Sequence, residues 1–150
     1  MNPLVVVGAG APGREGGVDL FLELMAAVAA RRPARFAWVG GRPRGVARRL
    51  DAETATLGLD GCVEWLPRGA SPREPGVVHV VTARTLAAAQ RSLAEVAGDV
   101  PVLGIAADPA VRELLEDRGS QVVPYPDLAG LAQLVVAGAG PGGADGRDER

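Results

Sequence analysis

The sequence predicts a single three-layer α/β/α domain built on a parallel sheet of about six strands. Short apolar runs rich in Val alternate with segments whose apolar residues recur every three or four positions. The first pattern is typical of strands covered on both faces, and the second of helices that lie on such a sheet. Strands that alternate with helices form βαβ units, which favour parallel pairing. With 150 residues, 47% of them hydrophobic, the chain can bury one core and is too short for two full-sized domains.

The first half of the chain begins with the most apolar strand. Residues 4–7 (Leu-Val-Val-Val) are a mostly β-branched run, which predicts the central strand of the sheet. Over residues 18–29 the apolar positions recur at spacings of three and four, which predicts a helix that stops near Pro33. The elements expected next are a strand at residues 35–39, a helix at residues 46–57 and a strand at residues 62–66.

The second half repeats the pattern and adds two signals for helix ends. Gly119 follows a helical stretch and is suited to end it, because glycine takes a left-handed conformation at no steric cost. Asp127 precedes another helical stretch and is expected to cap it. The expected elements are, in order, a strand at residues 77–81, a helix at 86–97, a strand at 102–106, a helix at 110–118, a strand at 122–123 and a final helix through Val136.

We expect a folded domain over residues 1–136 and a disordered tail over residues 137–150. The tail, AGAGPGGADGRDER, has no apolar periodicity and is rich in glycine and charge. It would bury too little apolar surface to offset the entropy cost of ordering. The folded part alternates strands and helices in the manner of Rossmann-like domains.

Composition argues against several classes of function. A net charge of −2 and 3% aromatic residues give neither the basic surface nor the stacking platform of a nucleic-acid-binding protein. No apolar stretch is long enough to span a membrane, and no basic residue precedes the first apolar run. We therefore expect a cytoplasmic protein with no nucleic-acid partner and no membrane insertion. The absence of Lys beside many Arg, Ala, Gly and Pro residues is typical of a GC-rich bacterial genome.

The residues with the most reactive side chains predict neither a metal site nor a catalytic triad. Cys62 is the one cysteine and His79 the one histidine. An intramolecular disulfide would lack its second cysteine, and a zinc site would lack enough Cys and His ligands. His79 lies within an expected strand, where a ring with satisfied hydrogen bonds is the simplest interpretation. We expect no catalytic residue and no metal ligand in this chain.

Ligands of such a sheet bind outside the carboxyl ends of the strands, where the strand order reverses. In the first loop at that edge, residues 8–13 match G-x-G-x-x-G, the fingerprint of dinucleotide-binding proteins. Its context is incomplete, because Pro12 and further glycines delay the helix and no acid ends the second strand. Arg42 and Arg44 keep an NADP-binding module as an alternative. The loops to consider are residues 8–17, 40–44, 82–85 and 107–109.

Several short stretches have recognisable sequences at fixed places in the expected fold. They are residues 14–21 (REGGVDLF), 36–41 (FAWVGG), 57–59 (LGL), 100–103 (VPVL) and 122–127 (VVPYPD). In this order and spacing they resemble glycosyltransferase family 4, in the C-terminal, donor-binding half of its GT-B enzymes. The resemblance covers about residues 4–136, nearly the whole expected domain.

The resemblance implies that a nucleotide sugar lies over the strand ends, with its diphosphate held by loop amides and helix N-termini. It also implies an acceptor-binding N-terminal domain elsewhere, so that this chain is not catalytic alone. No further cofactor is expected. The candidate donor-binding and phosphate-binding residues are Gly8, Gly10, Arg14, Gly16, Gly17, Gly41, Arg42 and Arg84.

The charged residues of the family's donor site are largely missing from this sequence. Its diphosphate-binding Arg and Lys fall on Ala9 and Gly16, and the chain has no Lys. Its two acids, which touch the sugar and the ribose, fall on Leu86 and Ala94. Each such contact is typically worth about 1.5–3 kcal/mol, so donor binding is expected to be weak unless other residues compensate.

Two neighbouring residues are candidates to compensate. Arg84 lies in the context Ala83-Arg84-Thr85, where the family has Ser-Arg-Glu; the alternative is a solvated surface arginine. Glu95 would replace the second acid only if the helix shifts by one residue, which turns a side chain by about 100°.

Two kinds of function stay open. The domain is either a weak or partner-dependent donor half, as an excised domain or as one subunit of a split enzyme that a separate N-terminal GT-B half completes. Or it is a degenerate, non-catalytic pseudo-glycosyltransferase that binds or stabilises a separate glycosyltransferase chain.

Overall fold

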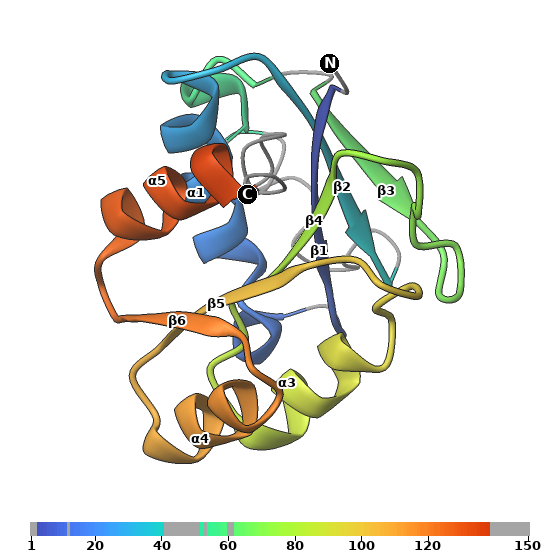
Figure 1. The fold of residues 1–150 in the computed structure, drawn as a ribbon. Coiled ribbons are helices and arrows are strands. Elements are labelled where there is room, and N and C mark those ends of the chain that lie inside the picture. Colours follow the sequence, from blue (N-terminus) through green and yellow to red (C-terminus); the bar gives the residue numbers. More distant parts are fainter. Residues whose placement is uncertain (1–2, 12, 41–51, 53, 60–61, 139–150) are drawn as a thin grey trace, which may run out of the picture.

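The strands of the protein form one parallel sheet (Figure 1). The computed structural model describes residues 3–11, 13–40, 52, 54–59 and 62–138. The strands are β1 (Leu4–Ala9), β2 (Ala34–Val39), β3 (Val63–Leu66), β4 (Val77–Val81), β5 (Val102–Ala106) and β6 (Gln121–Pro124). They lie in the order β3-β2-β1-β4-β5-β6, and each neighbouring pair is parallel.

The strand order reverses between β1 and β4. From β1 the chain adds β2 and β3 on one side, and then returns to add β4, β5 and β6 on the other. β1 is therefore an inner strand, and all its residues from Leu4 to Ala9 are buried, as the apolar run at residues 4–7 predicted. The carboxyl ends of β1 and β4 mark the place where ligands of such folds bind.

Helices cover both faces of the sheet and complete the predicted three layers. They are α1 (Val18–Ala29), α3 (Leu86–Leu93), α4 (Pro109–Asp117) and α5 (Leu128–Gly138). α1 and α5 lie side by side and share one core with Val80 of β4, whereas α3 and α4 share a second core with Val81 (Figure 1). Since successive side chains of a strand point to opposite faces, the two helix pairs cover opposite faces.

Two helix ends follow the predicted signals. Oδ1 of Asp127 accepts a hydrogen bond from the amide of Gly130 at 2.9 Å, which caps the first turn of α5. Gly119 follows α4 with φ of +84°, the left-handed conformation expected of a glycine after a helix.

α3 is shorter than the helix predicted over residues 86–97. It ends at Leu93, because beyond Ala94, whose amide still bonds to Gln90, the amides bond to carbonyls only three residues back. The amide of Glu95 donates to Ser92 and that of Val96 to Leu93, each at 3.1 Å. Gly98 then turns the chain with φ of +53°. The chain therefore leaves the axis of α3 shortly after Leu93.

Some expectations fall outside the described residues or at their border. Of the helix expected at residues 46–57, the structure describes Ala52 and residues 54–57; Ala52 and residues 54–56 are helical, and Leu57 lies in a turn. α5 runs past the predicted end at Val136, to Gly138. Residues 139–150 of the expected tail lie outside the described part, so the domain boundary stays a prediction.

His79 is a buried polar residue of β4. Its side chain is 1% exposed, and Nε2 lies 3.1 Å from the hydroxyl oxygen of Ser92 on α3. Nδ1 has no hydrogen-bond partner among the described residues, so only one ring nitrogen is satisfied, against expectation. Burial lowers the pKa of His79 to about 4, and the positive charge of Arg118 adds to the shift. The ring is neutral at neutral pH.

Because the folded state resists protonation of His79, the protein should lose stability on mild acidification. The unfolded chain takes up this proton near pH 6.5 and the folded protein only near pH 4. From pH 7 to pH 5 the free energy of unfolding should fall by about 2 kcal/mol, and the loss should level off below pH 4. Urea unfolding at both pH values measures it. The variant His79→Gln should lose most of this dependence, and an equal slope in both proteins would refute the assignment.

Candidate functional site

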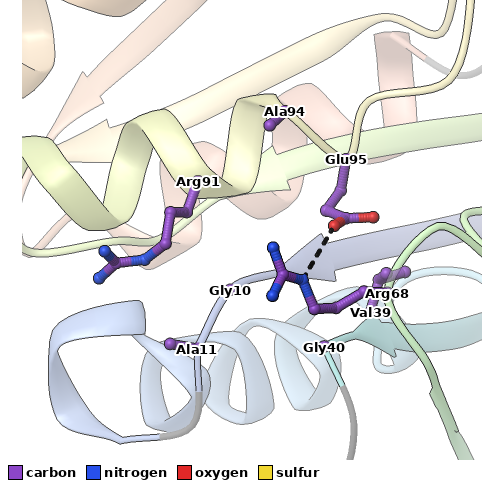
Figure 2. Close-up of a pocket in the computed structure, with 8 residues that line it drawn as sticks. All are labelled: Gly10, Ala11, Val39, Gly40, Arg68, Arg91, Ala94 and Glu95. Atoms are coloured by element: carbon purple, nitrogen blue, oxygen red, sulfur yellow. Dashed lines mark ion pairs between the residues drawn. The ribbon is translucent and has the colours of Figure 1, made fainter.

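A hollow of about 180 Å³ lies at the carboxyl ends of β1 and β2 (Figure 2). We call it the β1–β2 hollow. Its walls come from the ends of both strands, from the loop after β3, and from α3 with the turn that follows it. The residues that line it are Gly10, Ala11, Val39, Gly40, Arg68, Arg91, Ala94 and Glu95.

The floor of the β1–β2 hollow is built from glycine backbone. The amide of Gly10 donates to the carbonyl of Val39 at 3.0 Å, and the amide of Gly40 donates to that of Leu66 at 2.9 Å. Gly40 has φ of +130°, and a Cβ atom there would overlap the carbonyl oxygen of Gly10. These two predicted loops therefore meet at a point where only glycine fits, and their peptide groups face the hollow without covering side chains.

Glu95 forms the far wall together with the loop after β3. Its Oε1 accepts a hydrogen bond from the amide of Gly69 at 2.8 Å, and its Oε2 lies 3.9 Å from Nε of Arg68 (Figure 2). The sequence admitted Glu95 as a replacement acid only through a one-residue shift of the helix. The structure brings it to the hollow differently, because α3 has ended before Glu95. Ala94, the position aligned with the family's second acid, lines the same hollow.

Arg91 is a site residue that the sequence reasoning missed. It lies on α3, its side chain is exposed, and Figure 2 shows it reaching over the β1 loop beside Ala11. It also lines a second hollow of about 360 Å³, the loop hollow, with Ala11, Gly13, Arg14, Glu15 and Gly16. Its position one helical turn before Ala94 and Glu95 is a signal that could have found it.

The predicted glycines after β1 shape the loop more than they line a ligand site. A Cβ atom on Gly16 would lie 2.6 Å from the carbonyl oxygen of Ala11. Gly17 has φ of +78°, its carbonyl accepts a hydrogen bond from the hydroxyl of Thr82 at 2.8 Å, and a Cβ atom there would overlap the Thr82 backbone. Within the loop Gly16 thus packs closely against Ala11, and Gly17 packs closely against Thr82 at the end of β4.

Gly8 lies inside β1 and serves packing. A Cβ atom there would come within 2.7 Å of the Phe21 ring and 2.8 Å of the Trp38 ring. These two rings meet edge to face, with centroids 5.3 Å apart. The missing side chain of Gly8 makes room for this buried pair.

Arg84 has partners of its own at the end of β4. Its Nη1 and Nη2 donate to the two carboxylate oxygens of Asp19 at 2.7 and 2.9 Å, and Nη1 also donates to the carbonyl of Arg14 at 2.8 Å. With a side chain only 23% exposed, it is not a solvated surface arginine. Nor is its guanidinium free for a phosphate, because the fork is filled by Asp19.

The ion pair sets the charge of both partners. Burial alone would raise the pKa of Asp19, but the hydrogen bond and charge of Arg84 and the amides of Asp19 and Leu20 lower it. The hydrogen bond to Asp19 raises the pKa of Arg84. Both groups stay ionised at neutral pH, and they hold the start of α1 against the loop after β4.

The other predicted site residues are only partly placed. Arg14 lines the loop hollow and also a third hollow of about 220 Å³ at the ends of β4, β5 and β6, together with Arg84 and Tyr125. Gly41 and Arg42 lie outside the described residues. Leu86, aligned with the family's sugar-contacting acid, is 38% exposed at the start of α3.

The dinucleotide fingerprint at residues 8–13 lacks the structure it needs. A short 3₁₀ helix (Arg14–Gly16) follows the glycines, and α1 begins only at Val18. In a true fingerprint the helix opens within the glycines and its N-terminus faces the pyrophosphate. A true fingerprint also has an acid at the end of the second strand. Here Val39 is followed by Gly40, where the described segment ends, and neither residue is acidic.

No helix in the described ranges is both long and apolar enough to cross a membrane. In the same part of the chain, no three His, Cys, Asp or Glu side chains gather as a metal site would require. Cys62 is exposed.

Solved glycosyltransferases have the same fold. No protein-family model matches the sequence, and no curated protein matches it either. An S. aureus TarM variant, solved with fondaparinux, α-GlcNAc-glycerol and UDP, superposes with a TM-score of 0.68 at 12% identity. WaaG, a glycosyltransferase involved in lipopolysaccharide biosynthesis, gives 0.63 at 18% identity, and Anabaena HepE, solved with UDP and glucose, gives 0.63 at 16% identity.

The likeness covers nearly all of this chain but a minor part of the others. It includes 91% of this chain, against 28% of the TarM chain, 38% of WaaG and 39% of HepE. The chain therefore has the fold of a GT-B C-terminal-like domain, as the resemblance implied. At these identities the likeness concerns the fold.

The close approach of Gly17 to Thr82 should make Gly17→Ala strongly destabilising. Gly119, with φ of +84° and open space around it, offers a matched control for the cost of the left-handed backbone alone. Both variants pay that cost of about 1–2 kcal/mol, and Gly17→Ala should lose about 2 kcal/mol more through the overlap. Denaturant unfolding compares them. Equal losses would mean that the loop moves away from β4 without penalty.

The Asp19–Arg84 pair should show a larger coupling energy than an exposed pair of the same chemistry. Arg112 and Glu116 on α4 are the control, since their side chains are about half exposed, at 50% and 52%. A double-mutant cycle with Asp19→Asn and Arg84→Gln should give about 1–2 kcal/mol, against about 0.5 kcal/mol or less for Arg112→Gln and Glu116→Gln. Similar values in the two cycles would contradict the clamping role of Arg84.

Proposed function

We propose that this domain binds the nucleoside diphosphate part of a nucleotide sugar at the carboxyl ends of β1 and β2. The observation that carries the proposal is the β1–β2 hollow, where backbone of two strand ends meets arginine side chains next to the switch point of the sheet. TarM and HepE, which have the same fold, were solved with UDP.

The size of the site supports a ligand of this length. The β1–β2 hollow alone, at about 180 Å³, is smaller than the roughly 300–1,000 Å³ of typical small-ligand pockets. It shares Ala11 and Arg91 with the loop hollow of about 360 Å³. A nucleoside diphosphate that extends through both, with its diphosphate where the two hollows meet, would fill a groove of ordinary size.

The charges around the groove favour an anion. Arg14, Arg68 and Arg91 face the two hollows, together with Glu15 and Glu95. Glu95 is engaged by the amide of Gly69 and by Arg68, which leaves Arg14 and Arg91 to outweigh Glu15. The amides of Gly10 and Gly40 already donate to the carbonyls of Val39 and Leu66, so the attraction for an anion comes from the arginine side chains.

We further propose that sugar transfer, if the domain takes part in it, depends on a second chain or domain that carries the acceptor. The acids that the resemblance assigns to the sugar and the ribose are replaced by Leu86 and Ala94, at the two ends of α3, about 12 Å apart along its axis. An exposed leucine at the sugar position gives no hydrogen bond to a hydroxyl. This replacement also supports the second candidate function, a non-catalytic pseudo-glycosyltransferase that binds a separate glycosyltransferase chain.

A titration followed by backbone amide NMR tests the donor proposal. UDP, GDP and their sugar conjugates should each be added up to millimolar concentration, with NADPH as the comparison. We expect saturable shifts at Gly10, Ala11, Gly40 and Gly69 with one nucleoside diphosphate, and weak binding because few charged contacts are present. Ala11→Glu should weaken it at least about tenfold through like-charge repulsion.

Ala129→Glu is the control, since it adds the same charge to an exposed position on α5, on the opposite face of the sheet from α3. Shifts that are equal in the two variants would place the ligand elsewhere. No shift with any nucleoside diphosphate would refute donor binding and favour the pseudo-glycosyltransferase. Tighter binding of NADPH would favour the dinucleotide alternative.

A further inference from the structure

Any side-chain cation that meets a phosphate in this protein must be an arginine, because the chain has no Lys and its one His is buried and neutral. Four arginines of the described residues line the hollows at the carboxyl edge of the sheet: Arg14, Arg68, Arg84 and Arg91. Their partners differ, and the differences decide which of them is available to a ligand.

Arg84 and Arg68 are already engaged. Both terminal nitrogens of Arg84 donate to Asp19, so a phosphate would have to displace a carboxylate that is itself partly buried. Nε of Arg68 lies 3.9 Å from Oε2 of Glu95, and its side chain is 84% exposed, so Glu95 offsets part of its charge.

Arg14 is placed on the loop after β1, between two hollows. Its carbonyl accepts a hydrogen bond from Arg84, and the residue lines both the loop hollow, beside Glu15, and the third hollow. It does not line the β1–β2 hollow, whose floor Gly10 and Gly40 make.

Arg91 differs from the other three. Of the four it alone lines both the β1–β2 hollow and the loop hollow. Like Arg14, and unlike Arg68 and Arg84, it takes part in no ion pair within the described part of the chain. Its helix is fixed at this point, because the next residue, Ser92, is buried and bonded to His79 of β4 at 3.1 Å. Arg91 is thus a charge without an ion-pair partner among the described residues, on a helix that is fixed beside it, and it is shared by the two hollows. Figure 2 shows its side chain over the loop at Ala11.

We propose that Arg91 is the diphosphate-binding residue of the groove. This inference rests on the proposed function and adds which side chain supplies the charge. From α3, the planar guanidinium reaches over the loop at Ala11 (Figure 2), so that a diphosphate in the groove would meet its fork of N–H donors. A ligand with two phosphate groups would span the junction of the hollows at Arg91.

The test compares UDP, UMP and uridine on wild-type protein, Arg91→Ala and Arg91→Lys. With UDP, Arg91→Ala should weaken binding at least about tenfold, and its affinity should depend less on salt than that of the wild type. Arg91→Lys should recover part of the loss, because it keeps the charge without the fork. Uridine should bind all three proteins alike. Arg112→Ala, on an exposed face of α4, is the control for loss of one surface charge.

The outcomes separate this inference from the proposed function. If UDP shifts the groove amides of the wild type and Arg91→Ala binds UDP as tightly, the inference is overturned and the donor site stands. If Arg91→Ala weakens uridine as much as UDP, Arg91 supports the base end instead, and the inference is again overturned. If the wild type binds neither UDP nor GDP at millimolar concentration, both proposals fail; if it binds GDP alone, the same comparison is made with GDP, GMP and guanosine. Thermal unfolding confirms that each variant is folded.

Discussion

The contact between the loop after β1 and the end of β4 is the constraint on which the binding edge depends. The two segments are far apart in sequence. The hydroxyl of Thr82 nevertheless donates to the carbonyl of Gly17 at 2.8 Å, and the two terminal nitrogens of Arg84 donate to the carboxylate of Asp19. The backbone of Arg84 also donates to Glu15 at 2.8 Å. These bonds lie where the strand order reverses, and they add to the direct pairing of β1 with β4, the two inner strands at that point. They also fix where α1 begins.

This constraint uses up charge that a ligand site would otherwise have. A guanidinium that donates to two carboxylate oxygens and a carbonyl gains its stability from those bonds, and releasing it to a phosphate would leave Asp19 partly buried and unpaired. Arg84 is therefore better understood as part of the scaffold. The positive charge for an anion has to come from an arginine that the scaffold does not use. On the exposed face of α3, Arg91 is such a residue.

Much of the fold was predictable from sequence because its signals are local. The run at residues 4–7 predicts an inner strand through its own composition, and Asp127 and Gly119 act on the helices next to them. The site was predictable only in outline, because its decisive contacts join distant residues. Asp19 and Arg84 are 65 positions apart, and the space that Gly8 leaves is filled by the rings of Phe21 and Trp38. Glu95 reaches the groove because α3 ends early, an outcome of loop geometry that helical periodicity does not contain.

The glycines at this edge of the sheet are required by the fold, so they say little about function. Gly8, Gly17 and Gly40 each avoid a collision with the rest of the domain: with two aromatic rings, with the end of β4, and with Gly10. These collisions would occur whether or not a ligand binds, so the glycines would be required of an inactive descendant as much as of an active enzyme. They are evidence for the fold. Arg91 and Ala94 are different, since no contact within the described domain requires an exposed arginine or a small residue at these positions. The functional information of this edge of the sheet therefore lies in the side chains that the fold leaves free to vary.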